Sequence, residues 1–376
     1  MKAQGFIASR LRFKGRLAVV AIAVSFFVMI ISLAISAGFR TEIRRGISKI
    51  SGDIRLSGTE EPINARPSYI DKLESLSGVQ EITPVIWKPG IVKGPEDISG
   101  VLVKGIPMPD SCSLQAQIPS RLASKLQLSV GDSFTAWFIE DRVRARRFTV
   151  NGIYESLIDS DETLTVIVPL ADMQRLCGWE DSQAGALEVL LKNPDAADAT
   201  AFEMSVLSYG NHDTEEDVLY AATARARYPQ LFDWLDLIDV NVLAIIMLMI
   251  VVAGFNMISG LLILLFRNIS TIGMLKSLGM GNRAIAGVFL RVAARIVAIG
   301  MLIGNGAALL FCLLQSTTHL IKLNPANYFV SFVPVSINPG TVILVDALAF
   351  VAIMLLMLIP TLFISRVDPA ETVRVK

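Results

Sequence analysis

The residue types that usually carry catalysis or bind metals are few and scattered in this chain of 376 residues. Its two histidines, His212 and His319, lie far apart, and neither HExxH nor a CxxC pair occurs, which argues against a metal site. No GxSxG elbow is present, and the carboxylates form no recognisable catalytic pair. The phosphate-binding pattern GxxxxGKS/T is also missing. We therefore predict a non-catalytic chain that binds no metal or cofactor itself.

One short polar segment, RNISTIGMLKSLGMGNRAI (residues 267–285), lies between two of the most apolar stretches. It contains basic residues and three glycines but no acid. Ile272, Leu275 and Leu278 recur at helical spacing, which predicts an amphipathic helix with one apolar contact face. Gly273 and Gly279 would allow another backbone to approach closely. The residues alone favour equally a helix that docks on a protein and one that lies on lipid headgroups.

The elements around this segment are predicted to cross a membrane. The chain is 53% hydrophobic with a mean hydropathy of +0.55, which is too apolar for a soluble domain. Charge-free stretches of about 19 residues or more, enough to span a bilayer as helices, occur four times. They lie between Arg16 and Arg40, Asp239 and Arg267, Arg295 and Lys322, and Asp346 and Arg366. A fifth, residues 323–345, contains three prolines and is predicted to be mostly an outer loop.

The first span could instead be a secretory signal peptide, because it follows a basic start and ends near AISA. Its apolar run from Leu17 to Ala37 is longer than the roughly 7–15 residues typical of such peptides, which favours a retained anchor. Basic residues cluster before this span, in residues 267–283 and at the C-terminus. The positive-inside rule therefore places both termini and residues 267–290 in the cytoplasm.

The segment between the first two spans is predicted to be a large extracytoplasmic domain. Residues 38–239 hold 31 of the 34 acidic and 20 of the 34 basic residues, a net charge of −11 against +11 for the rest. Strand-like runs (GDIRLSG, GVLVKGI, SFTAWFI, RRFTVNGIY, TLTVIVP) alternate with helical patches (PSYIDKLESL, PSRLASKLQL, PLADMQRLCG), which predicts an α+β domain. Apolar stripes in residues 38–50 and 228–239 indicate that the flanking spans continue into this domain as helical stalks.

The predicted organisation is thus a multi-pass α-helical membrane protein of four transmembrane helices, with an α+β domain inserted between helices 1 and 2. The predicted boundaries are a cytoplasmic segment 1–16, span 17–39, extracytoplasmic domain with stalks 40–239, span 240–266, cytoplasmic helix and loop 267–290, span 291–318, outer loop 319–340, span 341–364 and cytoplasmic tail 365–376.

A few polar and small residues interrupt the predicted spans. Asn256, Ser259 and Asn305 are too few to line a hydrophilic pore, and hydrogen bonds between helices are favoured for them. Gly300 and Gly304 form a GxxxG pattern, which indicates close helix packing within this chain or with a second membrane chain. Two cysteines of the α+β segment, Cys112 and Cys177, could pair in an oxidising compartment or remain as buried thiols.

The sequence resembles a known family in several segments. FNMISGLLILLFRNISTIGMLKSLGMGNRAIAGVFL (residues 255–290) and the ending SRVDPAETVRVK are similar to the second span, the following helix and the tail of MacB/FtsX-type ABC permeases. FIASRLRFKG, IPSRLASKLQLSVGDSF and RRFTVNGIYESLIDSDETLTVIVPLADMQRL resemble the lipoprotein-releasing LolC/LolE type. The similar segments follow one another in the same order as in that family, along nearly the whole chain.

This resemblance implies a coupling helix that docks on a separate ATPase subunit, which would bind ATP and Mg²⁺. The docking residues implied are Ile272, Gly273, Met274, Leu275, Lys276, Ser277, Leu278 and Gly279. The sequence departs from the family at Thr271, where a Glu is usual, so one acidic docking contact is missing. The resemblance also implies two permease chains, identical or related, in a bacterial inner membrane.

The resemblance further implies mechanotransmission, in which ATP-driven motion passes through the stalks to the outer domain, to release lipoproteins to a periplasmic carrier. No nucleic-acid partner is implied. The alternatives are a MacB-like exporter of peptides or drugs and an FtsX-like regulator of a cell-wall hydrolase. Apolar residues near the stalk–span junctions are candidate contacts for acyl chains: Phe26, Phe27, Phe39, Leu231, Phe232 and Trp234.

Overall fold

The computed structural model describes residues 16–94, 97–139, 143–155, 164–211, 218–324, 328 and 330–361. The chain forms two compact units. The helical unit consists of the residues up to Phe39, Trp234–Ile321 and the residues from Val333 onward. The α+β domain consists of Arg40–Asp233 and Lys322–Phe332. The predicted fold class, a multi-pass helical membrane protein with an inserted α+β domain, is confirmed.

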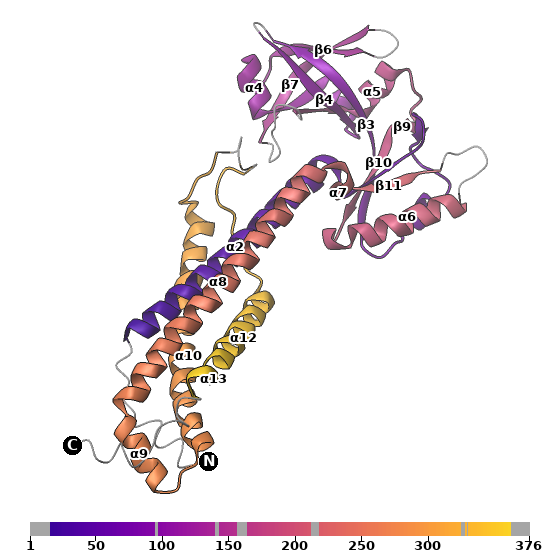
Figure 1. Cartoon of the computed structure of the whole chain (residues 1–376). Coiled ribbons are helices and arrows are strands. Elements are labelled where there is room, and N and C mark those ends of the chain that lie inside the picture. The colour runs from indigo at the N-terminus through magenta and orange to yellow at the C-terminus, as the bar shows by residue number, and fades with distance from the viewer. Residues whose placement is uncertain are drawn as a thin grey trace. The chain divides into compact units, whose positions relative to one another are not determined.

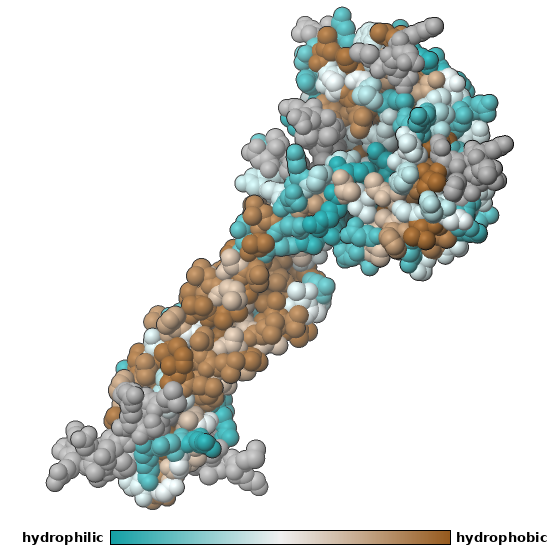
Figure 2. Space-filling model, turned by 45° about the vertical axis from the view of Figure 1, so that its right-hand side comes forward, coloured by the Kyte–Doolittle hydropathy of each residue, from teal (hydrophilic) through white to brown (hydrophobic). Residues whose placement is uncertain are grey.

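Among the described residues, four helical segments are long and apolar enough to cross a membrane. They are α2 (Arg16–Ser51), α8 (Pro229–Arg267), α10 (Asn282–Thr318), and α12 (Pro339–Leu356) with the short α13 (Leu358–Thr361). The parts of these helices in the helical unit run alongside one another (Figure 1). The face of this unit shown in Figure 2 is predominantly hydrophobic, as a surface in contact with lipid requires.

The fourth span is not the single helix predicted over residues 341–364. It begins at Pro339, because Asn338 caps the helix by accepting a hydrogen bond from the Gly340 amide at 3.0 Å. It is interrupted at Met357, three residues before Pro360. A proline cannot donate the helical hydrogen bond and its ring clashes with the carbonyl four residues earlier, which accounts for the interruption.

The predicted GxxxG contact lies within this chain, between α10 and α2. A side-chain carbon built at Gly300 would lie 2.7 Å from Ile22, and one built at Gly304 would lie 2.4 Å from the Ala23 carbonyl. Only glycine allows this approach at either position. Phe26 packs against Gly304 from α2 and is fully buried. Helix α2 is thus packed into the helical unit.

Both predicted stalks are confirmed as helices. Helix α2 continues past its apolar stretch to Ser51, and α8 starts at Pro229. Where the two helices leave the helical unit, the rings of Phe39 and Trp234 meet edge to face with centroids 5.8 Å apart. The Ser36 hydroxyl donates a hydrogen bond to Asp239 in the same region. These contacts hold α2 against α8 just before both enter the α+β domain.

The α+β domain contains a nine-stranded sheet in the order β11-β1-β10-β3-β4-β8-β5-β7-β6. Its strands are β1 (Ile54–Ser57), β3 (Val79–Lys93), β4 (Ile98–Ile106), β5 (Gln115–Pro119), β6 (Ser133–Ile139), β7 (Val143–Tyr154), β8 (Thr165–Pro169), β10 (Ala186–Leu191) and β11 (Tyr220–Thr223); β2 (Ile63–Asn64) and β9 (Gln183–Ala184) pair separately. Strand β3 also pairs with β6, so that the strands from β3 to β6 close on themselves.

Two hydrophobic cores divide this domain. One fills the closed part of the sheet beneath α4 (Ser120–Leu126) and α5 (Leu170–Cys177); the other lies between the open part and α3 (Ile70–Glu74) and α6 (Ala197–Asn211). Strand β3 serves both, pairing with β10 through its first half and with β4 through its second half. The remaining short elements are η1 (Asp110–Cys112), η2 (Pro194–Ala196) and α7 (Ala224–Arg227).

Every strand and helix predicted in this domain is present, but several were missed: β3, β5, β10, β11 and α6. Helices α4 and α5 each follow a proline and end at a residue with positive φ, Gln127 and Gly178. Part of the loop predicted over residues 319–340 lies in the described residues, and its last two residues belong to α12. Residues 319–324 and 330–338 form no helix and only one isolated β-bridge, between Lys322 and Phe332.

Candidate functional site

The predicted coupling helix is α9 (Ile269–Ser277), which follows α8 after a single bent residue, Asn268. It ends in a Schellman motif. The Met280 amide donates to the Leu275 carbonyl and the Gly279 amide to the Lys276 carbonyl, both at 2.9 Å. Gly279 has φ +84°, a left-handed conformation that glycine adopts without strain. The structure therefore gives Gly279 a role in the turn.

The predicted single contact face of this helix was wrong. Ile272 is 1% exposed and packs in the core of the bundle with Gly273 buried beside it, and Leu275 is half-buried against the same core. Met274 and Leu278, in contrast, are 59% and 78% exposed. The inner stripe of α9 is therefore used to attach the helix to its own bundle, which spacing alone does not reveal.

The surface that α9 leaves uncovered, here called the α9 exposed face, consists of Thr271, Met274 and Leu278. These positions are three and four residues apart and so lie on one side of the helix. Ser277 is also exposed, and Lys276 is partly buried in the last turn, where a cation complements the helix dipole. The face combines an apolar pair with a hydroxyl and carries no charge, a composition suited to a protein contact.

The six aromatic and aliphatic residues predicted at the stalk–span junctions do not form one surface. Phe26 is deep in the bundle, and Phe27 meets Phe311 of α10 with ring centroids 6.3 Å apart. Phe39 is buried on Trp234. Leu231 and Phe232 belong to the α+β domain, where both are buried. Intramolecular packing therefore accounts for most of this set.

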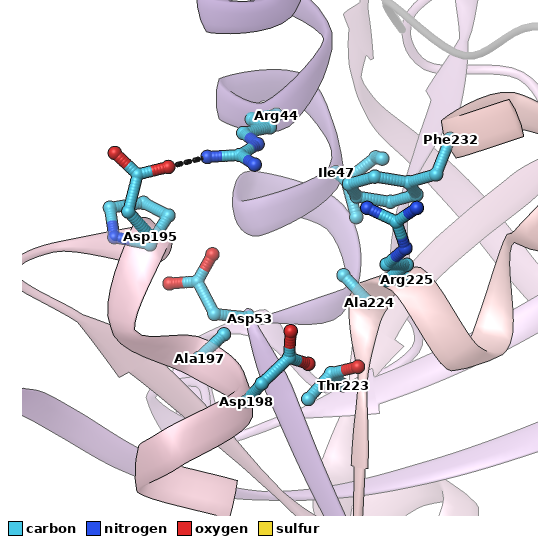
Figure 3. Close-up of a pocket in the computed structure, with 11 residues that line it drawn as sticks. Arg44, Ile47, Asp53, Asp195, Ala197, Asp198, Thr223, Ala224, Arg225 and Phe232 are labelled. Atoms are coloured by element: carbon cyan, nitrogen blue, oxygen red, sulfur yellow. Dashed lines mark hydrogen bonds and ion pairs between the residues drawn. The ribbon is translucent and has the colours of Figure 1, made fainter. Parts of the chain in front are cut away.

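A small pocket of about 60 Å³ lies in the α+β domain beside the last turns of α2 (Figure 3). Arg44 of α2 forms an ion pair with Asp195 of η2, drawn as a dashed line in Figure 3. Ile47 and Phe232 provide apolar lining, and Asp53 also lines the pocket. The ion pair between Arg44 and Asp195 attaches α2 to the domain at this pocket.

The end of α2 is fixed to the sheet by a buried ionic network that sequence reasoning missed. The Lys104 ammonium, on β4, donates to the Ile50 carbonyl at 2.5 Å and to Glu188 of β10 at 2.6 Å. Glu188 also accepts from the Trp87 indole of β3 at 2.7 Å and from Arg55 of β1 at 3.3 Å. We call these five residues the α2 joint, because they connect four strands to the last turn of α2.

The charges of the α2 joint are compensated by several contacts. Lys104 and Glu188 are each 6% exposed, and Arg55 and Lys104 lie over the Trp87 ring at 4.7 and 5.2 Å. Burial lowers the pKa of Lys104, an effect that the neighbouring Glu188 opposes. Nearby, Arg227 donates to the Gly52 carbonyl at 2.7 Å, and burial followed by the charge of Arg55 lowers its pKa to about 10.

A weak sequence signal for this network does exist. Lys104 and Glu188 are single charges inside the otherwise apolar runs GVLVKGI and GALEVLL. A buried charge needs a partner, so two such strands indicate an ion pair. Among the described residues, no three His, Cys, Asp or Glu side chains gather to hold a metal ion. Cys112 and Cys177 are not joined by a disulfide.

Two family matches cover most of the chain. Residues 17–207 match the MacB-like periplasmic core domain, and residues 243–369 match the FtsX-like permease C-terminal family. The chain therefore belongs to the MacB/FtsX-type family of ABC transporter permeases, which confirms the resemblance seen in the sequence. Within such a transporter the permease is a non-catalytic subunit.

Curated relatives named lipoprotein-releasing system transmembrane protein LolC are similar over almost the full length. The protein of Xylella fastidiosa strain 9a5c is 23% identical over 407 residues, which cover 98% of this chain and 95% of that protein. The protein of Neisseria meningitidis serogroup B is 21% identical over 414 residues, which cover 99% of this chain and 96% of that protein.

Solved structures of two periplasmic or extracellular domains are also similar. The extracellular domain of the transporter YknZ from Gram-positive bacteria is 14% identical, with a TM-score of 0.31, and the match covers 45% of this chain and 99% of that domain. The periplasmic region of MacB from Actinobacillus actinomycetemcomitans is 13% identical, with a TM-score of 0.30, and the match covers 50% of this chain and 97% of that region.

Proposed function

We propose that this chain couples ATP hydrolysis by a separate ATPase subunit to motion of the α+β domain, and that the motion releases lipoproteins from the bacterial inner membrane. The nearly full-length similarity to proteins named LolC supports the choice of lipoproteins. Both termini and α9 are cytoplasmic in this proposal, and the α+β domain is periplasmic, as the distribution of basic residues favours.

The observation that carries the proposal is that α8 is one continuous helix, which starts in the α+β domain and ends next to α9. Helix α8 runs without interruption from Pro229 to Arg267, and α9 begins at Ile269. A helix of this length spans roughly 58 Å. In the proposed mechanism, a displacement of α9 passes along α8 to the α+β domain, and α2 moves with α8 because the two helices are in contact at Phe39 and Trp234.

The α9 exposed face is the proposed docking surface for the ATPase. Leu278→Asp places a charge in this contact, and desolvating that charge would cost several kcal/mol. We expect the variant to lose the ATPase partner that copurifies with the unmodified chain. Leu275 is less suitable for this test because it packs on the bundle core, so its substitution would also affect folding.

Asn282→Asp is the matched control for this experiment. It adds the same charge at an exposed position at the start of α10, outside the α9 exposed face. We expect it to retain the ATPase, and both variants to show the same melting temperature. Equal copurification of the ATPase with Leu278→Asp and with the unmodified chain would refute docking at this face.

The cargo is tested by capturing the complex without ATP and identifying what is bound. An acylated lipoprotein should be retained and should dissociate when ATP is added, because each buried methylene contributes roughly 0.8 kcal/mol. The same lipoprotein with its acylated cysteine replaced should not be retained. Capture of a cell-wall hydrolase in place of lipoproteins would instead support an FtsX-like regulator, and capture of free peptides would support an exporter.

The proposed assembly contains two permease chains and two ATPase subunits, since each chain offers one coupling helix and nucleotide sites in this class form between two subunits. The second permease chain is either identical or related. ATP and Mg²⁺ belong to the ATPase subunits, and a periplasmic carrier would receive the released lipoprotein.

A further inference from the structure

A single acidic residue, Asp346, lies inside the fourth apolar span. It is about two turns into α12 and is 9% exposed. The Asn305 amide of α10 donates a hydrogen bond to its Oδ2 atom. The sequence predicts helix-to-helix hydrogen bonding for Asn305, and this contact between α10 and α12 provides it. The coupling of ATP hydrolysis to motion described above assigns no role to this pair.

The remaining oxygen atoms of this pair have no partner. Asp346 Oδ1 and Asn305 Oδ1 are both buried, and neither has a hydrogen bond. Both atoms are acceptors if the carboxyl group is ionised, so neither can satisfy the other. Leaving two buried acceptors unpaired costs free energy that a native structure rarely accepts. A proton on Asp346 Oδ1 would turn this atom into a donor, and Asn305 Oδ1 is the buried acceptor of the same pair that still lacks a hydrogen bond.

The distribution of charges along the four helices also favours a protonated Asp346. Helix α12 contains no other charged residue, α8 has none between Asp239 and Arg267, and α2 has none between Arg16 and Arg40. On α10, Arg295 is the closest cation to Asn305 in sequence and lies roughly 15 Å away along the helix axis. No basic residue within these helical stretches is therefore placed to balance an ionised Asp346. A carboxylate without a cation in an apolar span takes up a proton instead.

We propose that Asp346 is a proton-binding site and that its protonated carboxyl group forms a cyclic pair with Asn305. The Asn305 amide donates to Oδ2 of Asp346, and the proton on Oδ1 is donated to the Asn305 carbonyl oxygen. The proton comes from water and neutralises the carboxylate, so no charge remains in the span. The two hydrogen bonds fasten α10 to α12, and loss of the proton would leave a charge that separates these helices.

Dicyclohexylcarbodiimide tests this site, because it enters apolar regions and reacts with protonated carboxyl groups. The acid proton moves to a carbodiimide nitrogen while the carboxylate oxygen adds to the central carbon, so the product is the sum of both molecules. With the full chain in membranes at pH 7, we expect this adduct on Asp346 by mass spectrometry. A water-soluble carbodiimide should modify exposed acids such as Asp110 and leave Asp346 unmodified. Modification of Asp346 by the water-soluble reagent alone would overturn the proposal.

Infrared difference spectra between the unmodified chain and Asp346→Asn provide a second measurement that does not depend on reagent access. The carbonyl stretch of a protonated carboxyl group should be present in the unmodified chain and missing in the variant. A carboxylate band in its place would overturn the proposal.

Two substitutions distinguish the contribution of the proton to stability from that of the hydrogen bonds. Asp346→Asn resembles the protonated acid and preserves two hydrogen bonds with Asn305, so its melting temperature should be unchanged. Asp346→Ala should lower the melting temperature by several degrees, because Asn305 loses its partner. Equal losses in these two variants would mean that the ionised form is the one the fold requires, and the proposal would be wrong.

Discussion

At the scale of residues, the charged side chains that connect the end of α2 to the sheet are buried. Lys104 joins the last turn of α2 to Glu188, and Glu188 also accepts hydrogen bonds from Trp87 and Arg55. A buried ion pair contributes little net stability, yet it is costly to break from one side. Under the proposed function, such a network suits a joint, because it resists the separation of α2 from the sheet that it must move.

Removal of one partner from the α2 joint should therefore destabilise the α+β domain. Lys104→Met leaves Glu188 buried without its ammonium, and we expect a loss of about 3 kcal/mol. Lys88→Met is the control, because it breaks the more exposed pair with Glu61, and should cost at most about 1 kcal/mol. Denaturant unfolding of the purified full chain, followed by tryptophan fluorescence, measures both. Similar losses in the two variants would contradict the role assigned to the joint.

At the scale of elements, the sequence predicts those helices and strands whose local pattern is strong. The missed strand β3 contains Pro84 and Pro89, and prolines argue against a strand when only the sequence is considered. Each proline lies where β3 pairs with a single neighbour, Pro84 with β10 and Pro89 with β4, so the missing amide can face the side without a ladder. Helix α6 was missed because its apolar residues do not gather on one side; Phe202 is exposed while Met204 is buried.

The candidate site was only partly predictable for a similar reason. The position of α9 follows from its composition, but the side that faces its own bundle does not. Ile272 and Leu278 have the same apolar character, and only the packing of α9 on the bundle makes one buried and the other exposed. The α2 joint depends on side chains that are distant in the sequence, so no local pattern brings them together.

The packing of α2 against α10 gives a test at the scale of elements. Gly304→Val places a side chain against the α2 backbone, where a built carbon would lie 2.4 Å from the Ala23 carbonyl. Overpacking of this kind costs typically about 1–3 kcal/mol. Gly306→Val is a matched control two residues further along α10, because no atom lies within 4 Å of its built carbon. The melting temperature in detergent should fall for Gly304→Val alone, and an equal fall for both would contradict this packing.

At the scale of the whole molecule, composition gives the architecture more directly than it gives any site. Apolar stretches of sufficient length define the four spans, because the backbone in lipid must satisfy its hydrogen bonds within a helix. The charge of −11 on residues 38–239 and +11 on the rest separates a domain in water from a basic membrane part. Neither the length of the apolar stretches nor the net charge of a segment depends on which side chains contact each other.

The orientation that this charge distribution predicts can be measured with single cysteines. Cys112, Cys177 and Cys312 are first replaced, and one cysteine is then introduced at Ser182 of the α+β domain or at Ser277 of α9, which are both exposed. An impermeant thiol reagent added to intact spheroplasts should label Ser182→Cys, because that domain faces the periplasm in the proposed topology.

Ser277→Cys should be labelled only after the membrane is disrupted, because the basic residues around α9 hold that loop in the cytoplasm. Labelling in disrupted membranes also shows that the thiol is reactive, so protection in spheroplasts reports location rather than burial. If Ser277→Cys is labelled from outside while Ser182→Cys is protected, the chain is inverted. In that case α9 cannot meet a cytoplasmic ATPase, and the proposed coupling fails even though the fold is unchanged.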